Sequence, residues 1–197
     1  MAKEKRPEIP PLRAADRIRR SARDLFYHQG IRAVGVDAIV AKAGVTKPSL
    51  YRTFASKDEL AAAYLRDYEV DFWRRFDASI AAHPGDPRAQ ILAYFTGLAE
   101  RADRPDYRGC GLTNACIEYP EPDHPARLVS VANKREVRER LVDMARSMGA
   151  RDPEMLGDGL QLLMEGAYAS SQLLGADGPV RSLVAAAARL IDACRDV

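Results

Sequence analysis

The sequence contains little of what secreted or metal-binding proteins usually show. Its 197 residues include only three cysteines, Cys110, Cys116 and Cys194, an odd number without a Cys-x-x-Cys pair. This pattern argues against both a disulfide framework and a structural zinc site. We therefore expect buried thiols, with neither a metal ion nor another cofactor.

Long apolar segments are also missing. The uncharged run from Leu183 to Ala188 is far shorter than the roughly 20 residues of a membrane-spanning helix. The first residues, Met1 to Arg6, lead into no hydrophobic signal segment. These features predict a cytoplasmic protein without a membrane partner. With 47% hydrophobic and 29% charged residues, the chain can bury a core, which excludes wholesale disorder.

The small net charge of +2 hides an uneven distribution along the chain. Residues 1–60 hold 13 Lys and Arg against 7 Asp and Glu, whereas residues 61–197 hold 17 against 21. A basic N-terminal module on a mildly acidic body suits a polyanionic partner at one end only.

Hydrophobic spacing predicts an all-α chain, because apolar residues recur at helical intervals and nothing alternates with a period of two. Capping residues and Pro or Gly breaks set the expected boundaries. The nine expected helices span about 13–29, 36–43, 47–54, 56–82, 86–103, 109–118, 125–148, 152–174 and 178–195.

The first three of these helices form a helix-turn-helix layout. The tight turn Gly44, Val45, Thr46 joins the second helix to the third, and Gly44 stands where a left-handed backbone is tolerated. Leu50 and Phe54 fill the inward stripe of the third helix. Its other side chains are left for solvent or a partner, including Tyr51, which could otherwise be a core aromatic.

The stretch from Arg13 to Leu60 closely resembles the DNA-binding domain of TetR-type bacterial transcriptional regulators. The resemblance is carried above all by residues 44–60, Gly-Val-Thr-Lys-Pro-Ser-Leu-Tyr-Arg-Thr-Phe-Ala-Ser-Lys-Asp-Glu-Leu. The Gly-Val turn, the Leu-Tyr pair, the aromatic Phe and the Ser-Lys-x-x-Leu start of the fourth helix occur in the family's order and spacing. Pro48 stands where many members of the family have Gly, Ala or Ser.

The resemblance implies a nine-helix, all-α homodimer whose first three helices bind DNA and whose other helices form a ligand-responsive, dimerising body. We expect a flexible arm over residues 1–12, a DNA-binding domain over 13–60 with its helix-turn-helix at about 35–54, and a ligand-binding and dimerisation domain over 61–197. Arg52 is placed near DNA because it lies within one turn of the start of the third helix. The family's contacts, by position, would fall on Val36, Thr46, Lys47, Pro48, Ser49, Tyr51 and Lys57.

Candidate ligand-pocket residues are harder to select. Asn114, Glu118 and Glu165 are polar groups on helices expected to pack inside the body, so each needs a partner or a ligand. Helix capping or interhelical hydrogen bonds would serve equally well. The aromatic candidates, which could equally be plain core, are Trp73, Tyr94 and Tyr168.

Two local features suggest specific functions, a metal site and a redox sensor. His124 could bind a metal together with Asp123 and Glu118, although a helix cap beside Pro125 is the better interpretation. Cys110 and Cys116 could sense oxidation, but Arg108 is the only cation near them in sequence that could lower a thiol pKa.

The last two helices combine small and aliphatic residues, such as Gly159 and Gly166 on one and Ala187 and Leu190 on the other. Two such helices from each subunit would build a four-helix homodimer interface. An internal core is the competing interpretation.

These observations together predict a regulator, most simply a repressor, that binds a palindromic double-stranded DNA operator and is released by a small-molecule effector. An enzyme is disfavoured because His28, His83 and His124 lie at a helix end and in two Pro-flanked loops, and because no nucleophile elbow or phosphate loop occurs. A helical adaptor that binds protein instead of DNA is the other alternative.

Overall fold

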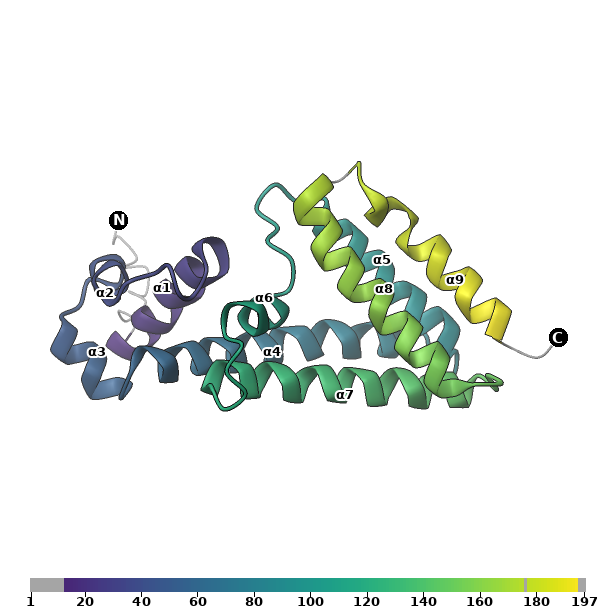
Figure 1. The fold of residues 1–197 in the computed structure, drawn as a ribbon, viewed down its shortest axis with the longest axis horizontal. Helices are drawn as coiled ribbons and strands as arrows, with labels where there is room; N and C mark the ends of the chain where they lie inside the picture. Colours follow the sequence, from purple (N-terminus) through teal and green to yellow (C-terminus); the bar gives the residue numbers. More distant parts are fainter. Residues whose placement is uncertain (1–12, 176, 195–197) are drawn as a thin grey trace, which may run out of the picture.

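The computed structural model describes residues 13–175 and 177–194, and this part of the chain is all-α, as predicted (Figure 1). The described residues form nine α-helices and one short 3-10 helix, η1. Their bounds are α1 Ala14–Gln29, α2 Val36–Ala43, α3 Lys47–Thr53, α4 Lys57–Ala82, α5 Pro87–Ala102, α6 Gly111–Glu118, α7 Pro125–Ser147, α8 Pro153–Leu174, η1 Pro179–Ser182 and α9 Leu183–Cys194. The arm predicted for residues 1–12 lies outside the described residues.

Helices α1 to α3, here called the head, gather at one end of an elongated molecule, and α4 leads from them into the body, α4 to α9 (Figure 1). The head has its own small core, in which the side chains of Ile18, Ile39 and Leu50 are fully buried. Gly44 ends α2 with a φ of +61°, and its N–H bonds to carbonyls of the preceding turn. This left-handed residue turns the chain sharply into α3.

Side-chain caps fix where the helices begin. Thr46, Ser56, Asp86 and Asp152 each accept a hydrogen bond from the backbone N–H three residues later. Each such bond satisfies one of the donors that a helix start leaves unpaired. Glu59 completes the start of α4 by accepting from the N–H of Ala55 at 2.6 Å. These local bonds explain why the predicted starts of α3, α4, α5 and α8 agree with the structure.

Two helix starts differ from the prediction. The sixth helix begins at Gly111 instead of residue 109, because Gly109 has a φ of +71° and Cys110 is extended. The last helix is preceded by the 3-10 turn Pro179–Ser182, so its α-helical part begins at Leu183.

The body is built on α4 and α7, which run side by side in the same direction away from the head (Figure 1). Glu69 of α4 accepts a hydrogen bond from Asn133 of α7. Further along the same two helices, Asp77 of α4 accepts a hydrogen bond from Arg140 of α7. Helix α8 packs on α7, and α9 packs on α5 and α8.

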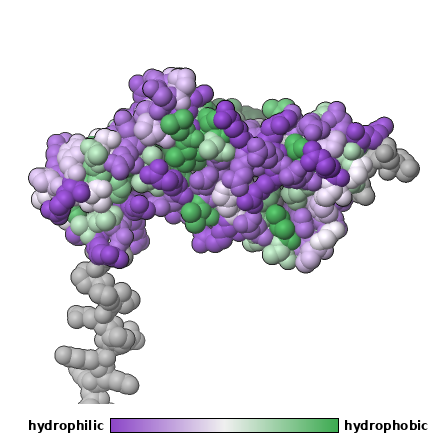
Figure 2. All heavy atoms as spheres, turned by 90° about the horizontal axis from the view of Figure 1, so that it is seen from below, coloured by the Kyte–Doolittle hydropathy of each residue, from purple (hydrophilic) through white to green (hydrophobic). Residues whose placement is uncertain are grey.

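The surface of this framework is mostly hydrophilic. Figure 2 shows one face on which hydrophobic residues form a few separate patches among polar ones. Among the described residues, no helix is long and apolar enough to cross a membrane.

Candidate nucleic-acid interface and cavity between head and body

The outer face of α3 is open to solvent. Leu50 is fully buried beneath the helix, whereas Thr46, Lys47, Pro48 and Arg52 are exposed. Tyr51 is 49% exposed, so it lies outside the core. A short helix that keeps its polar side chains outward has the shape needed to enter the major groove of DNA.

Bonds within α3 hold several of these side chains in place. The Arg52 guanidinium donates to the Ser49 hydroxyl at 3.2 Å, and the Thr46 hydroxyl accepts from the Ser49 N–H at 3.4 Å. Lys47 pairs with Asp37 of α2 at 2.8 Å on the surface. Such an exposed pair contributes little, so the lysine can exchange Asp37 for a phosphate at small cost.

Val36 and Lys57 flank α3 from two sides. Val36 is the first residue of α2 and is half-buried. The Lys57 ammonium donates to the Arg32 carbonyl at 3.3 Å and lies beside Tyr119 and His124 of the α6–α7 loop. Burial lowers the pKa of Lys57, and the nearby carboxylates of Asp58 and Glu118 oppose this effect.

Two solvent-exposed arginines of α1 form ion pairs with α4. Arg19 pairs with Asp67 at 2.9 Å, and Arg23 pairs with Asp71, both on α4. These two arginines therefore connect the head to α4 instead of adding to a free basic surface. The reason is tertiary: α1 lies across α4, so acids 48 positions away in sequence reach them.

A cavity of about 350 Å³ lies between the head and the body. Helix α1, α4, α5, the loop 104–107 and Tyr168 of α8 all line it. Its wall is rich in two residue types. The tyrosines are Tyr27, Tyr64, Tyr68, Tyr94, Tyr107 and Tyr168; the arginines are Arg20, Arg23, Arg75, Arg101 and Arg104.

Of the six predicted pocket residues, Tyr94 and Tyr168 line this cavity, and their hydroxyls lie 3.4 Å apart. Trp73 packs instead against Phe72 and Phe76, with the Arg140 guanidinium 3.9 Å from its ring centre. Asn114 donates to the Arg108 carbonyl at 2.7 Å, which holds the start of α6.

Glu118 joins the head to the body. Its carboxylate accepts from the Arg32 N–H at 2.7 Å, and its carbonyl accepts from the Arg32 guanidinium at 3.0 Å. A side chain at Gly30, whose φ is +88°, would lie 3.3 Å from the same carboxylate. The polar group at this position has therefore found a protein partner.

Glu165 is likewise engaged within the body. It accepts from the Thr113 hydroxyl at 2.7 Å and pairs with Lys134 at 2.7 Å. The same Lys134 ammonium lies 3.5 Å from the Cys110 sulfur. Arg108 is the only cation near Cys110 in sequence, but α7 brings a lysine from 24 positions away against this cysteine in the folded chain.

The remaining cysteine and histidine hypotheses have simpler outcomes. Burial raises the pKa of the Cys116 thiol, which disfavours the reactive thiolate. The His124 ring accepts from the Ala126 N–H at 3.2 Å as the cap of α7. No group of three His, Cys, Asp or Glu residues suited to a metal ion occurs in ranges 13–175 and 177–194.

Most residues on the cavity wall were missed by sequence reasoning. Tyr64, Tyr68 and Phe72 carry a visible signal, because they recur at four-residue intervals along α4. Arg75 and Arg101 carry none, since an arginine on an amphipathic helix is usually solvent-exposed. Only the packing of α4 and α5 against each other turns both toward one space.

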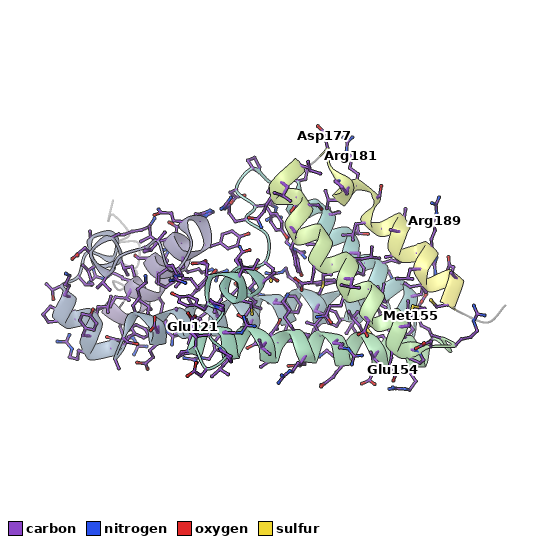
Figure 3. All side chains as sticks on the ribbon, in the orientation of Figure 1. Glu121, Glu154, Met155, Asp177, Arg181 and Arg189 are labelled. Atoms are coloured by element: carbon purple, nitrogen blue, oxygen red, sulfur yellow. The ribbon has the colours of Figure 1, made fainter. Side chains whose placement is uncertain are left out.

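An apolar groove lies between α8 and α9. Its lining includes Gly159, Leu162, Gly166 and Leu190, and the Leu162 side chain is 72% exposed. Figure 3 shows Arg189 pointing outward from α9, and Asp177 and Arg181 projecting beyond the end of α8. An exposed apolar strip on an otherwise polar surface is typical of an interaction surface.

Comparison with known proteins agrees with this architecture. The sequence profile of the family described as "Bacterial regulatory proteins, tetR family" matches residues 18–64. A TetR-type transcriptional regulator from Streptomyces avermitilis is 33% identical, with 93% of this chain and 98% of that chain covered and a TM-score of 0.81.

Two further proteins are similar over most of their length. The structure of SCO4454, a TetR-family transcriptional regulator from Streptomyces coelicolor, has a TM-score of 0.88 at 28% identity, with 93% and 96% of the chains covered. The transcriptional regulator AcuR from Cereibacter sphaeroides is 29% identical over 173 residues, which are 83% of this chain and 78% of AcuR. The chain therefore belongs to the TetR family and is a DNA-binding transcriptional regulator.

Proposed function

We propose that the protein is a homodimeric repressor that binds a palindromic operator and is released from it by a small-molecule effector. The observation that carries this proposal is the position of the cavity, which α1 of the head and α4, α5 and α8 of the body line together. A molecule bound there touches both parts, so it can favour one arrangement of the head over another.

The proposed DNA contacts divide into two groups. Thr46, Lys47, Pro48, Ser49, Tyr51 and Arg52 of α3 and its cap would face the groove. Val36 and Lys57 would lie near phosphates on either side. Because Pro48 has no N–H and the Ser49 N–H already bonds to Thr46, the first turn of α3 would contact DNA mainly through side chains.

The proposed homodimer uses the groove between α8 and α9. Pairing these helices with their symmetry copies would cover Leu162 and its neighbours and would leave the two heads at fixed separation. A palindromic operator then requires the two α3 helices to reach successive major grooves, about 34 Å apart. An effector that changes the angle of α1 and α4 would break this match.

The decisive experiment is selection of fragments bound by the purified protein from the genome of its own organism. Recovered sites should contain an inverted repeat, and one dimer should bind each repeat. Affinity should fall steeply with salt, because phosphate contacts release counterions. Binding to acidic proteins with no preference for duplex DNA would support an adaptor and refute the proposal.

The dimer surface has its own variant and control. Leu162→Glu should give a monomer in sedimentation, whereas Leu128→Glu, which changes an exposed leucine of α7 outside the groove, should stay dimeric. If Leu162→Glu remains a dimer, the subunits associate through another surface.

A further inference from the structure

We propose that the cavity between the head and the body binds a small organic carboxylate with an apolar body, whose negative charge is held by Arg75 and Arg101. This inference rests on the proposed function for its biological meaning, but it assigns a chemical class that family membership does not supply. Three properties of this cavity support the inference: the unpaired positive charge of its wall, its neutral hydrogen-bond donors and its volume.

The charge of the wall is unbalanced. Two of its charged residues are already engaged elsewhere, since Arg23 pairs with Asp71 and Asp24 with Lys42. Among the described residues, four other arginines on the wall, Arg20, Arg75, Arg101 and Arg104, have no carboxylate within ion-pair distance. Asp106 is the other acidic residue on the wall, so the cavity keeps a net positive charge.

Arg75 is the most informative of these residues. It lies on α4 and lines the cavity, and its Nε is buried without a hydrogen-bond partner. A buried donor without a partner costs free energy, and for a charged group that cost is larger. A bound carboxylate would satisfy it, because a guanidinium can donate two parallel hydrogen bonds to the two carboxylate oxygens.

The tyrosines supply neutral donors around these arginines. Burial raises the pKa values of Tyr64, Tyr94, Tyr107 and Tyr168, so their hydroxyls stay protonated at neutral pH. Neither Tyr64 nor Tyr107 makes a hydroxyl hydrogen bond to another described residue. Protonated hydroxyls beside guanidinium groups favour an anionic ligand and disfavour a cationic one.

The same wall defines the rest of the ligand. Phe72, Leu98 and the tyrosine rings provide apolar surface, and the volume of about 350 Å³ is at the low end of the roughly 300–1,000 Å³ of small-molecule sites. The ligand should therefore be small, with an aromatic or short aliphatic body. Because five of the lining residues lie on α1, such a ligand would contact the head directly.

Matched pairs of probes test the charge of the ligand separately from its shape. Benzoate, trans-cinnamate and octanoate are compared with benzamide, cinnamamide and octanamide by calorimetry and thermal shift on the full chain. At least one carboxylate should bind and raise the melting temperature, and its amide should bind at least about ten-fold more weakly. Equal binding of the amides, or no binding by any of the three carboxylates at millimolar concentration, would overturn the assignment.

Variants then test which side chain holds the charge. Arg75→Gln should weaken the carboxylate roughly 10- to 100-fold, and Arg75→Lys should restore part of this loss. Arg135→Gln changes an exposed arginine of α7 outside the cavity and should have no effect. If Arg75→Gln does not fold, Arg101→Gln is measured in its place. A folded variant with unchanged affinity for the carboxylate refutes the proposal.

A DNA-release assay separates this inference from the proposed function. If the carboxylate binds in the cavity but does not lower the affinity for a recovered operator, the ligand assignment stands and the effector mechanism fails. If only the neutral amide releases the operator, the effector mechanism stands and the carboxylate assignment fails.

Discussion

Two neighbouring residues of α3 should separate stability from DNA binding. Leu50 is fully buried under the helix, and Tyr51, the next residue, is 49% exposed. Leu50→Ala leaves a cavity in the small core of the head, which should lower the free energy of unfolding by about 2–5 kcal/mol. Tyr51→Ala removes a surface side chain, so its effect on stability should stay within about 0.5 kcal/mol.

For DNA affinity the order of the two variants should be reversed: among folded molecules, Tyr51→Ala should weaken binding more than Leu50→Ala does. If Tyr51 contacts the operator, its loss at about 1–3 kcal/mol per contact should weaken binding roughly 5- to 150-fold. Leu50→Ala touches no DNA, so its folded fraction should bind normally at low temperature. Urea unfolding and fluorescence anisotropy with a recovered operator measure the two quantities on the same samples.

One pattern of results would refute the reasoning. If Tyr51→Ala lost several kcal/mol of stability while its folded form bound the operator like the parent protein, the exposed face of α3 would not be the surface that contacts DNA. The placement of α3 in the groove would then have to be abandoned.

The remaining predictions concern the turn, the junction and the buried tyrosines. Gly44→Val should destabilise the head by about 1–2 kcal/mol in a thermal melt, because a φ of +61° is strained for any residue with a side chain; a melting temperature equal to that of the parent protein would contradict this. Glu118→Ala removes the acceptor of the Arg32 N–H, so hydrogen exchange at Arg32 should be roughly ten-fold faster; unchanged protection would show that this bond does not hold the head. Burial raises the pKa of Tyr119 to about 12, and also raises the pKa values of Tyr64 and Tyr107, from an ordinary value of 10. The folded state then holds more protons than the unfolded state above pH 10, so stability should be complete below pH 10 and fall as the pH rises toward 12. Because Tyr51 is exposed, tyrosinate absorbance from more than one tyrosine well before unfolding would contradict this.

The sequence by itself determined where the helices are and what kind of protein they form. The start of α3 follows from Thr46, and the start of α4 from Ser56, through bonds that span only three residues. The turn at Gly44 follows from a backbone conformation that glycine adopts without strain. Local hydrogen bonds and apolar periodicity depend on near neighbours, so they can be predicted from the chain alone.

Only the tertiary structure decided which polar side chains are available to a ligand. Glu118 found Arg32 across 86 positions, and Glu165 found Lys134 and Thr113. Arg75, which the sequence does not distinguish from a solvent-exposed arginine, was instead left without a carboxylate partner on the cavity wall. The physical reason is that each helix can turn any of its faces toward a neighbour, and the partners of a side chain depend on how all the helices pack together.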